Sequence, residues 1–351
     1  MNSVPNLFKG LTAVAAVSAA SITYLYNTNP EAAMFYWMPS KTNIAAATAS
    51  NALYKPAKRP VGLFFGGTSG IGQAMAEQFA RQTNGRAQIV ILGRNEQAAR
   101  AIIEGFPRTD SSTPEEESSK YSFIKVDATS MAQVREVTAK LSSELDKVNY
   151  IVATTGFLTL KGRDETSEGI DKKLACNFYA RFRFIYDLMP LIEKAANDGE
   201  ETGVLSVLSA GRGQHVELDD LGLVKRYSLS KAEGHAITYN DAVMNNLASK
   251  YPKSRFYHSF PGAVDTPILK AFPGASIFYP TLKVLAKPLL MSPEECAQVM
   301  WWRLWTKESP WTTGDHQINH RGEEIPHNRH VTEETTKAIW EHALKMTGPR
   351  Q

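Results

Sequence analysis

The sequence predicts an α/β protein in which one doubly wound parallel sheet carries helices on both faces. From residue 61 to about residue 260, short apolar runs of strand length alternate with longer segments whose apolar residues recur at helical spacing. A glycine-rich turn directly follows the first apolar run. Alternation of this kind is typical of parallel strands joined by crossover helices, which bury both faces of the sheet.

The first strand is expected at residues 61–65, and the turn after it contains Gly66, Gly70 and Gly72. Apolar residues then recur at helical spacing, so a helix follows the turn. Glycines allow the backbone to approach a diphosphate closely, and the N-terminus of the helix offers it unpaired N–H groups. The segment therefore predicts a nucleotide-binding turn, with a purely structural tight turn as the alternative. Gln73 stands where a Walker A loop has its lysine, which excludes that class of phosphate-binding loop.

The remaining elements follow in alternating order. Strands are expected at residues 87–92, 121–126, 149–153, 204–208 and 255–260, and helices at 95–105, 131–145, 167–195 and 227–250. Residues 109–120 are rich in Ser, Glu and Pro and are expected to form a surface loop. No internal repeat appears. These elements predict a single domain over residues 59–351.

Residues 1–58 do not share this pattern and are expected to form an N-terminal extension. Residues 10–26 are uncharged, only mildly apolar and near the lower length limit for a membrane-spanning helix. The extension is therefore either a weak membrane anchor or a poorly ordered segment. It contains no arginine, which a mitochondrial presequence would need. Positive charges after residue 26 outnumber those before residue 10, so we expect the chain in the cytoplasm or on the cytosolic face of a membrane.

Composition excludes several functional classes. The net charge of +3 is spread along the chain without a basic stripe, so nucleic acid is not an expected partner. Cys176 and Cys296 are far apart and are expected to be small core residues, not metal ligands. Four histidines, His316, His320, His327 and His330, lie in a polar C-terminal segment that we interpret as a solvated loop rather than a metal site. No Gly-x-Ser-x-Gly motif precedes a helix, which excludes the corresponding hydrolases.

Tyr227 and Lys231 are four residues apart, a spacing that places both side chains on one face of a helix. A tyrosine with its ordinary pKa near about 10 is a poor acid or base at neutral pH. A neighbouring ammonium favours the phenolate, so the pair predicts proton transfer to or from a bound substrate. The motif is weak by itself and gains its weight from the glycine turn upstream.

Together with that turn, these residues resemble the short-chain dehydrogenase/reductase family from about residue 60 to the C-terminus. The three glycines occupy the family's positions, with Phe65 in place of its threonine. The segments at 155–158, 239–241 and 292–296 are most similar to a fungal branch of uncharacterised or biosynthetic-tailoring reductases. The long interval between Ser209 and Tyr227 is similar to that of retinol-dehydrogenase-like members. The resemblance implies a Rossmann fold and an oxidoreductase that interconverts alcohols and carbonyls with a nicotinamide cofactor.

The resemblance also implies the site residues. The catalytic residues would be Tyr227 as proton donor, Lys231 lowering its pKa and holding the ribose, Ser209 binding the substrate oxygen, and Asn177 connecting Lys231 to solvent through water. Besides Tyr227 and Lys231, the cofactor would be held by Gly66, Thr68, Ser69, Gly70, Ile71, Gly72, Arg94, Asp127, Thr155, Gly156, Pro261, Gly262 and Thr266. Two departures stand beside these matches, because Ala153-Thr154-Thr155-Gly156 replaces Asn-Asn-Ala-Gly and Ala210 replaces a second serine.

The end of the second strand indicates which cofactor is used. It reads Leu92-Gly93-Arg94-Asn95, with no acid for a ribose 2′-hydroxyl and with an arginine suited to a 2′-phosphate. This predicts NADP(H), unless Arg94 is merely a solvated loop residue. The apolar segment 271–290 is expected to line a pocket for a bulky apolar substrate, to touch a membrane or to pack in the core.

The sequence thus predicts an NADP(H)-dependent oxidoreductase acting on an apolar small molecule. The alternative, suggested by Ala153, Thr154 and Ala210, is an NADP-binding module that keeps the fold with little or no turnover. Weak membrane association and homo-oligomer formation are both compatible with this prediction.

Overall fold

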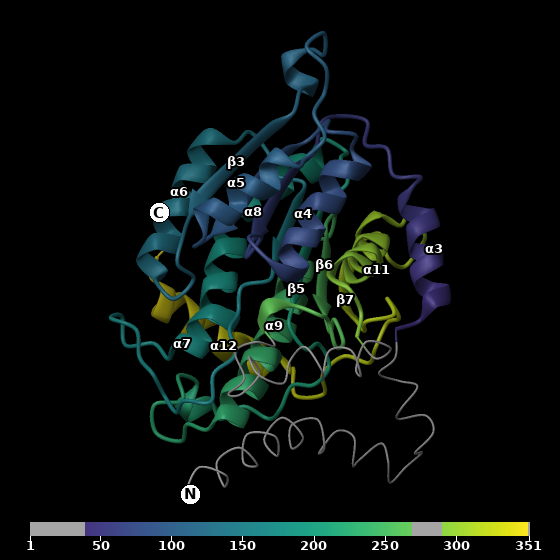
Figure 1. The fold of residues 1–351 in the computed structure, drawn as a ribbon. Coiled ribbons are helices and arrows are strands. Elements are labelled where there is room, and N and C mark those ends of the chain that lie inside the picture. The colour runs from purple at the N-terminus through teal and green to yellow at the C-terminus, as the bar shows by residue number, and fades with distance from the viewer. Residues whose placement is uncertain (1–38, 269–289, 350–351) are drawn as a thin grey trace, which may run out of the picture.

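The computed structural model describes residues 39–268 and 290–349, and Figure 1 shows their arrangement. Seven parallel strands form one sheet in the order β3-β2-β1-β4-β5-β6-β7. The strands are β1 (Val61–Phe65), β2 (Gln88–Gly93), β3 (Lys120–Lys125), β4 (Tyr150–Ala153), β5 (Gly203–Val207), β6 (Arg255–Ser259) and β7 (Gly314–Ile318). The chain order reverses between β1 and β4, which makes the crevice where doubly wound sheets bind their ligands.

Helices cover both faces of the sheet. One face carries α3 (Lys41–Asn51), α4 (Gly70–Gln82), α5 (Glu96–Glu104) and α11 (Pro293–Trp305). The other carries α6 (Met131–Glu144), α8 (Ala180–Asn197), α9 (Leu229–Lys250) and α12 (Glu333–Thr347). The predicted doubly wound parallel sheet is therefore confirmed, and most predicted bounds differ from the observed ones by one or two residues.

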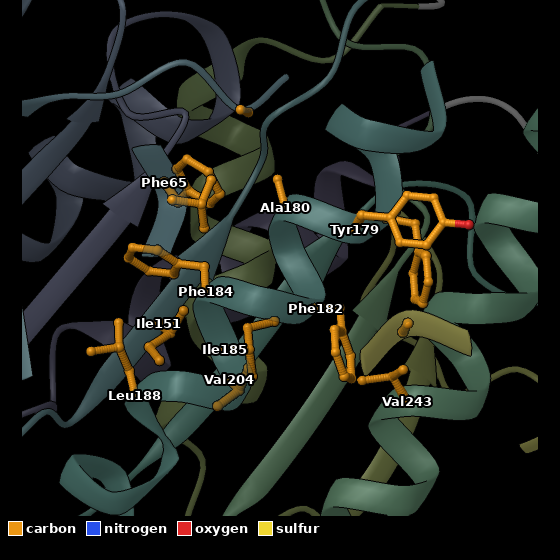
Figure 2. Packing of buried hydrophobic residues seen from close by; sticks show 14 of the residues in the cluster. Phe65, Ile151, Tyr179, Ala180, Phe182, Phe184, Ile185, Leu188, Val204 and Val243 are labelled. Atoms are coloured by element: carbon orange, nitrogen blue, oxygen red, sulfur yellow. The ribbon is translucent and has the colours of Figure 1, made fainter. Parts of the chain in front are cut away.

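Apolar strands and an apolar face of α8 form the core beneath the crevice. Phe65 of β1 stacks on Phe184 with ring centroids 4.6 Å apart. Figure 2 shows Leu188 of α8 next to Ile151 of β4, and Val204 of β5 below the same helix. All five residues of β1 are buried, as expected for a strand covered on both faces.

The segment before β1 is part of the domain. Helix α3 packs on α11, side by side in Figure 1, and Asn51 donates hydrogen bonds to the backbone and side chain of Gln298. Tyr54 then stacks on Trp305 with ring centroids 4.2 Å apart, and Trp305 stacks on Trp301 at 4.4 Å. Residues 39–58, which the sequence analysis assigned to the extension, thus include a helix and an aromatic side chain that pack on the domain. Their partners, such as Gln298 and Tyr150, lie far away in the sequence, so local patterns do not reveal these contacts.

The C-terminal polar segment also differs from the prediction. Residues Gly314–Ile318 form β7, which pairs with β6 in parallel. His316 and His320 are buried; His316 Nδ1 lies 2.9 Å from Glu324 Oε1, and its Nε2 lies 2.9 Å from the carbonyl oxygen of Thr313, which accepts the hydrogen bond. A solvated loop is thus the wrong interpretation for these two residues, since a strand with polar side chains lacks the apolar pattern by which strands are predicted. His327 lies in a loop and is exposed, as expected.

Two helix starts were also placed wrongly. The helix predicted from residue 167 begins as α7 (Lys172–Leu174), continues as a π-helical turn at Ala175–Tyr179 and then becomes α8. The helix predicted from Tyr227 begins at Leu229, because the side chain of Ser228 caps it by accepting from the backbone N–H of Lys231. A short polar side chain at the N-cap position fixes the residue at which a helix begins, here two residues after the predicted start.

Two of the predictions concern segments outside the described residues, namely 10–26 and nearly all of 271–290. Across 39–268 and 290–349, no helix combines the length and apolar character needed to cross a bilayer.

Candidate functional site

A cavity of about 600 Å³ opens at the carboxyl ends of the central strands. Fourteen of the predicted site residues line it: Gly66, Thr68, Ser69, Gly70, Ile71, Gly72, Arg94, Asp127, Thr155, Gly156, Asn177, Pro261, Gly262 and Thr266. They come from the segments that follow β1, β2, β3, β4 and β6 and from the π-helical turn, and the parallel sheet brings them to one edge.

The glycine turn forms the middle of this cavity. Gly66 has a φ of +98°, and a β-carbon there would lie 2.7 Å from Thr154 Oγ1. Only glycine fits this backbone at such a close approach. Helix α4 starts directly after the turn, and its N-cap residue Ser69 makes no side-chain capping bond. The N–H groups at this end are thus directed at the cavity, where they suit a phosphate.

The ends of β2 and β3 form one side of the cavity. A β-carbon on Gly93 would lie 2.8 Å from Thr68 Cγ2, so no acidic side chain fits at that position without displacing Thr68. Arg94 follows it and is exposed on the cavity rim. Asp127 accepts hydrogen bonds from the backbone N–H and the hydroxyl of Thr129, which fixes its carboxylate.

The ends of β4 and β5 form the other side. Thr155 Oγ1 donates to the carbonyl of Cys176 at 3.1 Å. The next residue, Asn177, is in the π-helical turn, a feature that often marks functional positions. Its Oδ1 is buried without a hydrogen-bond partner among the described residues. An acceptor that lines a cavity in this state indicates that a ligand or water completes its bonding.

Three residues that were not predicted to belong to the site also line this part. Arg181 is fully buried and binds the carbonyl oxygens of Thr155 and Val207. Glu233 of α9 forms an ion pair with Lys173, 3.2 Å apart. Cys176 also borders the cavity, but burial raises its thiol pKa to about 12, so it is no nucleophile at neutral pH. Helix prediction follows the spacing of apolar residues, so it does not reveal a buried charged residue such as Arg181.

The predicted catalytic pair lies outside this lining. Tyr227 precedes the first turn of α9, so Tyr227 and Lys231 do not share one helical face as predicted. Lys231 Nζ is 2.7 Å from Oε1 of Glu217, a residue of the long segment that separates Ser209 from Tyr227. Ser209 follows the lining residue Leu208 but does not line the cavity itself. The structure thus places fourteen of the predicted site residues on one cavity, whereas Tyr227, Lys231 and Ser209 are not among the residues that line it.

The phenol of Tyr227 is buried without a hydrogen-bond partner among residues 39–268 and 290–349. Burial, followed by the negative charge of Asp171, raises its pKa to about 12. Lys231, which the sequence analysis expected to lower this pKa, is paired with Glu217 in this structure. In this arrangement Tyr227 remains a neutral phenol at physiological pH.

The donor set fits a nicotinamide dinucleotide. The turn and the α4 N-terminus would hold the diphosphate, Arg94 and Asp127 the adenosine half, and Gly156, Asn177 and Pro261 the nicotinamide half. Apolar side chains continue the cavity beyond that last region, contributed by Phe157, Leu158, Leu208 and Ile268. Within the described part of the chain, no group of three or more His, Cys, Asp or Glu side chains is placed to bind a metal ion.

Comparison with known proteins agrees with this geometry. The sequence model of the short chain dehydrogenase family matches residues 61–273. Oxidoreductase AN1596 of Emericella nidulans is 33% identical over 239 residues, which cover 68% of this chain and 68% of the relative. Other curated relatives are also mainly fungal oxidoreductases.

Solved structures share the fold. An alcohol dehydrogenase from Thermococcus sibiricus complexed with 5-hydroxy-NADP superposes with a TM-score of 0.50, at 17% identity over 77% of this chain and 100% of the other. A 3-ketoacyl-(acyl-carrier-protein) reductase from Brucella melitensis complexed with NADH gives 0.52, at 20% identity over 76% and 99%. The glycine turn, the parallel sheet and the family match lead to one conclusion: this chain is a member of the short chain dehydrogenase family of oxidoreductases.

Proposed function

We propose that the protein interconverts a carbonyl and an alcohol on an apolar small molecule, with NADP(H) as its cofactor. The observation that carries the cofactor choice is the end of β2, where Gly93 packs against Thr68 and Arg94 follows at the cavity rim. An NAD-specific site places a carboxylate near the ribose 2′-hydroxyl, whereas a guanidinium suits a 2′-phosphate. The apolar rim of the cavity supports an apolar substrate.

The bound nicotinamide supplies the hydride acceptor or donor. The chain's own residues orient the substrate carbon and move the proton of its oxygen. In the reductive direction Tyr227 donates that proton, Ser209 hydrogen-bonds the oxygen and Lys231 favours the phenolate that remains. Asn177, with its buried and unpartnered Oδ1, holds the water that reconnects Lys231 to solvent.

These roles require the segment from Ser209 to Lys231 to change its position when ligands bind. Lys231 must leave Glu217, and the Tyr227 phenol must leave the neighbourhood of Asp171 for the cavity. The ion pair is not a large barrier, because both side chains are partly exposed and such pairs contribute little to stability. Closure of a loop around substrate is a common step in enzymes.

A second candidate is an NADP-binding protein with little turnover. The same observations favour it: Lys231 is engaged by Glu217, Tyr227 has a raised pKa, and neither side chain lines the cavity. In that case the fold binds the cofactor but the proton donor never reaches the substrate.

The deciding experiment is a screen of the purified full-length chain with NADPH against apolar ketones, aldehydes and lipid carbonyls, following NADPH absorbance. We expect consumption with at least one class of apolar carbonyl and a clear preference for NADPH over NADH. Tight NADPH binding without consumption across the panel would favour the second candidate. A preference for NADH would overturn the cofactor assignment.

A further inference from the structure

Arg181 is a buried arginine at the nicotinamide side of the cavity. Its side chain comes from the first turn of α8 and is 1% exposed. Nε donates to the carbonyl of Thr155 at 3.1 Å, and Nη1 donates to Ser206 Oγ and to the carbonyl of Val207, each at 2.8 Å. One guanidinium therefore connects the carboxyl ends of β4 and β5.

The same network reaches the π-helical turn. Ser206 Oγ donates to Asn240 Oδ1 at 2.8 Å, and Asn240 Nδ2 donates to the carbonyl of Asn177 at 2.9 Å. All of these side chains are at most 3% exposed. Because every member has its partner, the guanidinium is held in one position at the cavity wall.

Every acceptor in this set is neutral. Burial lowers the pKa of Arg181 to about 10, which still leaves the group charged at neutral pH. A β-carbon on Gly156 would lie 3.7 Å from its Nη2, so the charge lies directly behind the backbone at the cavity surface. Buried charges are usually paired with an opposite charge. The hydrogen-bond partners of Arg181 are all neutral, and the one carboxylate that attracts it, Glu233, is also paired with Lys173.

The other charges at this side cancel each other. Glu233 lines the cavity and is paired with Lys173 at 3.2 Å, which gives the pair no net charge. Arg94 and Asp127 lie at the other side, at the ends of β2 and β3. In the present conformation Arg181, Lys173 and Glu233 together therefore carry a net charge of +1 at the nicotinamide side.

We infer that Arg181 makes this site selective for the reduced form of its cofactor. The inference rests on the proposed function, since it takes the region of Gly156 and Asn177 as the nicotinamide subsite. The oxidised and reduced dinucleotides carry the same phosphates and differ in charge only at the nicotinamide ring, which is cationic when oxidised. A fixed positive charge in a poorly solvated wall repels the cationic ring and leaves the neutral ring unaffected.

Such selectivity would keep the protein loaded with reduced cofactor, ready to receive a carbonyl compound. For charges about 10 Å apart at the effective dielectric constant of protein sites, the repulsion corresponds to roughly a tenfold difference in affinity. Arg181 thus acts as a specificity-determining residue that also positions the strand ends.

The test is to titrate the full-length protein with NADPH and with NADP⁺ by calorimetry and to compare the two dissociation constants. We expect the parent to bind NADPH about tenfold more tightly. Arg181→Gln should bring the ratio close to one, and Arg181→Lys should keep most of it. Glu233→Gln should raise the ratio further, because it leaves Lys173 without its counter-charge.

Two matched controls separate charge from packing. Ser206→Ala removes one hydrogen-bond acceptor of the Arg181 guanidinium and keeps its charge. The ratio of the NADP⁺ and NADPH dissociation constants should therefore stay the same. Arg183→Gln removes another fully buried arginine of α8, one that is paired with Asp187 and does not line the cavity, so it tests general destabilisation.

The results distinguish this inference from the proposed function. A parent that binds NADP⁺ as tightly as NADPH overturns the role of Arg181 even where Arg181→Gln does not fold. A ratio that Arg181→Gln leaves unchanged also overturns it, while the proposed activity stands. The expected ratios without any carbonyl reduction support the inference and count against the proposed activity. Binding of neither form would overturn both.

Discussion

At the scale of single residues, the proposed cofactor choice depends on the end of β2. Gly93 has no room for an acid because Thr68 packs against it, and the next residue is a guanidinium on the rim. Asn177 presents a buried acceptor without a partner in the described chain. Tyr227 lies near Asp171, and Lys231 is paired with Glu217. The proposed proton transfer therefore requires both side chains to move.

Replacing Arg94 by Ala should weaken NADPH binding by about tenfold or more, because the guanidinium would lose charge-assisted hydrogen bonds to the 2′-phosphate. NADH has no 2′-phosphate, so its affinity should hardly change. Titration of both cofactors by tryptophan fluorescence measures this. Equal losses for both would show that Arg94 stabilises the loop without reading the phosphate.

Replacing Tyr227 by Phe should abolish carbonyl reduction and leave NADPH affinity nearly unchanged, because only the proton donor is removed. Steady-state rates and a cofactor titration of the same preparation test this. Ultraviolet titration adds an independent readout: one tyrosine whose pKa is near 12 should disappear from the variant. A Phe variant as active as the parent would contradict the mechanism.

Two elements that the sequence did not reveal complete the sheet and its cover. Helix α3 and Tyr54 extend the aromatic packing of Trp301 and Trp305 on one face. Strand β7 closes the edge beside β6, and its residue Asp315 is 3.1 Å from His327 in the loop that follows. Both depend on contacts with distant residues.

Tyr54→Ala should lower the free energy of unfolding by about 3 kcal/mol, the usual range for truncating a buried aromatic side chain. The ring is 6% exposed, and its hydroxyl is 3.2 Å from that of Tyr150. Leu53→Ala is the matched control, since its side chain is 80% exposed and should change stability by less than about 0.5 kcal/mol. Urea unfolding compares the two, and equal effects would show that α3 does not pack as described.

His327→Gln should destabilise the protein more at pH 6 than at pH 9. The hydrogen bond to Asp315 raises the pKa of His327, so its stabilisation is complete below the ordinary histidine value and is lost as pH rises through the folded one. The effect at pH 6 should stay below about 1 kcal/mol, because the side chain is half exposed. Thermal melting at both pH values measures it, and a loss that is the same at both would contradict this pairing.

At the scale of the whole molecule, the first and the last helix of the described chain both pack on elements far away in the sequence. Helix α3 packs on α11, whose Trp301 donates to the carbonyl of Met75, 226 positions away. Helix α12 returns to cover α8 and α9. The cavity lies at the carboxyl ends of the strands, at the point where the strand order reverses.

Removal of residues 1–38 tests the two interpretations of the N-terminal segment and keeps α3 in place. If residues 10–26 anchor the protein, the full-length chain should sediment with membranes and the shortened chain should stay in the supernatant. If the segment is only an extension, both should be soluble. Fractionation of cells that express each form decides between the two, and NADPH binding by the shortened form is the control for its folding.

The sequence by itself determined the fold class, the family and fourteen of the residues that line the cavity. Strand and helix periodicity, and the conformational demands of Gly66 and Gly72, are local properties that are legible in a few consecutive residues. The topology of a parallel sheet then brings the strand ends together, so fourteen predicted residues line one cavity without any knowledge of side-chain contacts.

Only the tertiary structure decided the seventh strand, the place of α3, the charge of Arg181 in the cavity wall and the pairing of Lys231 with Glu217. Strand β7 has polar side chains and is held in the sheet by its backbone hydrogen bonds to β6. Helix α3 packs on α11, which lies far away in the sequence. Arg181 is tolerated because carbonyls from two separate strands accept its hydrogen bonds. These features depend on groups far apart in the chain, and the energy of a buried or paired group is set by its surroundings, which no local pattern encodes.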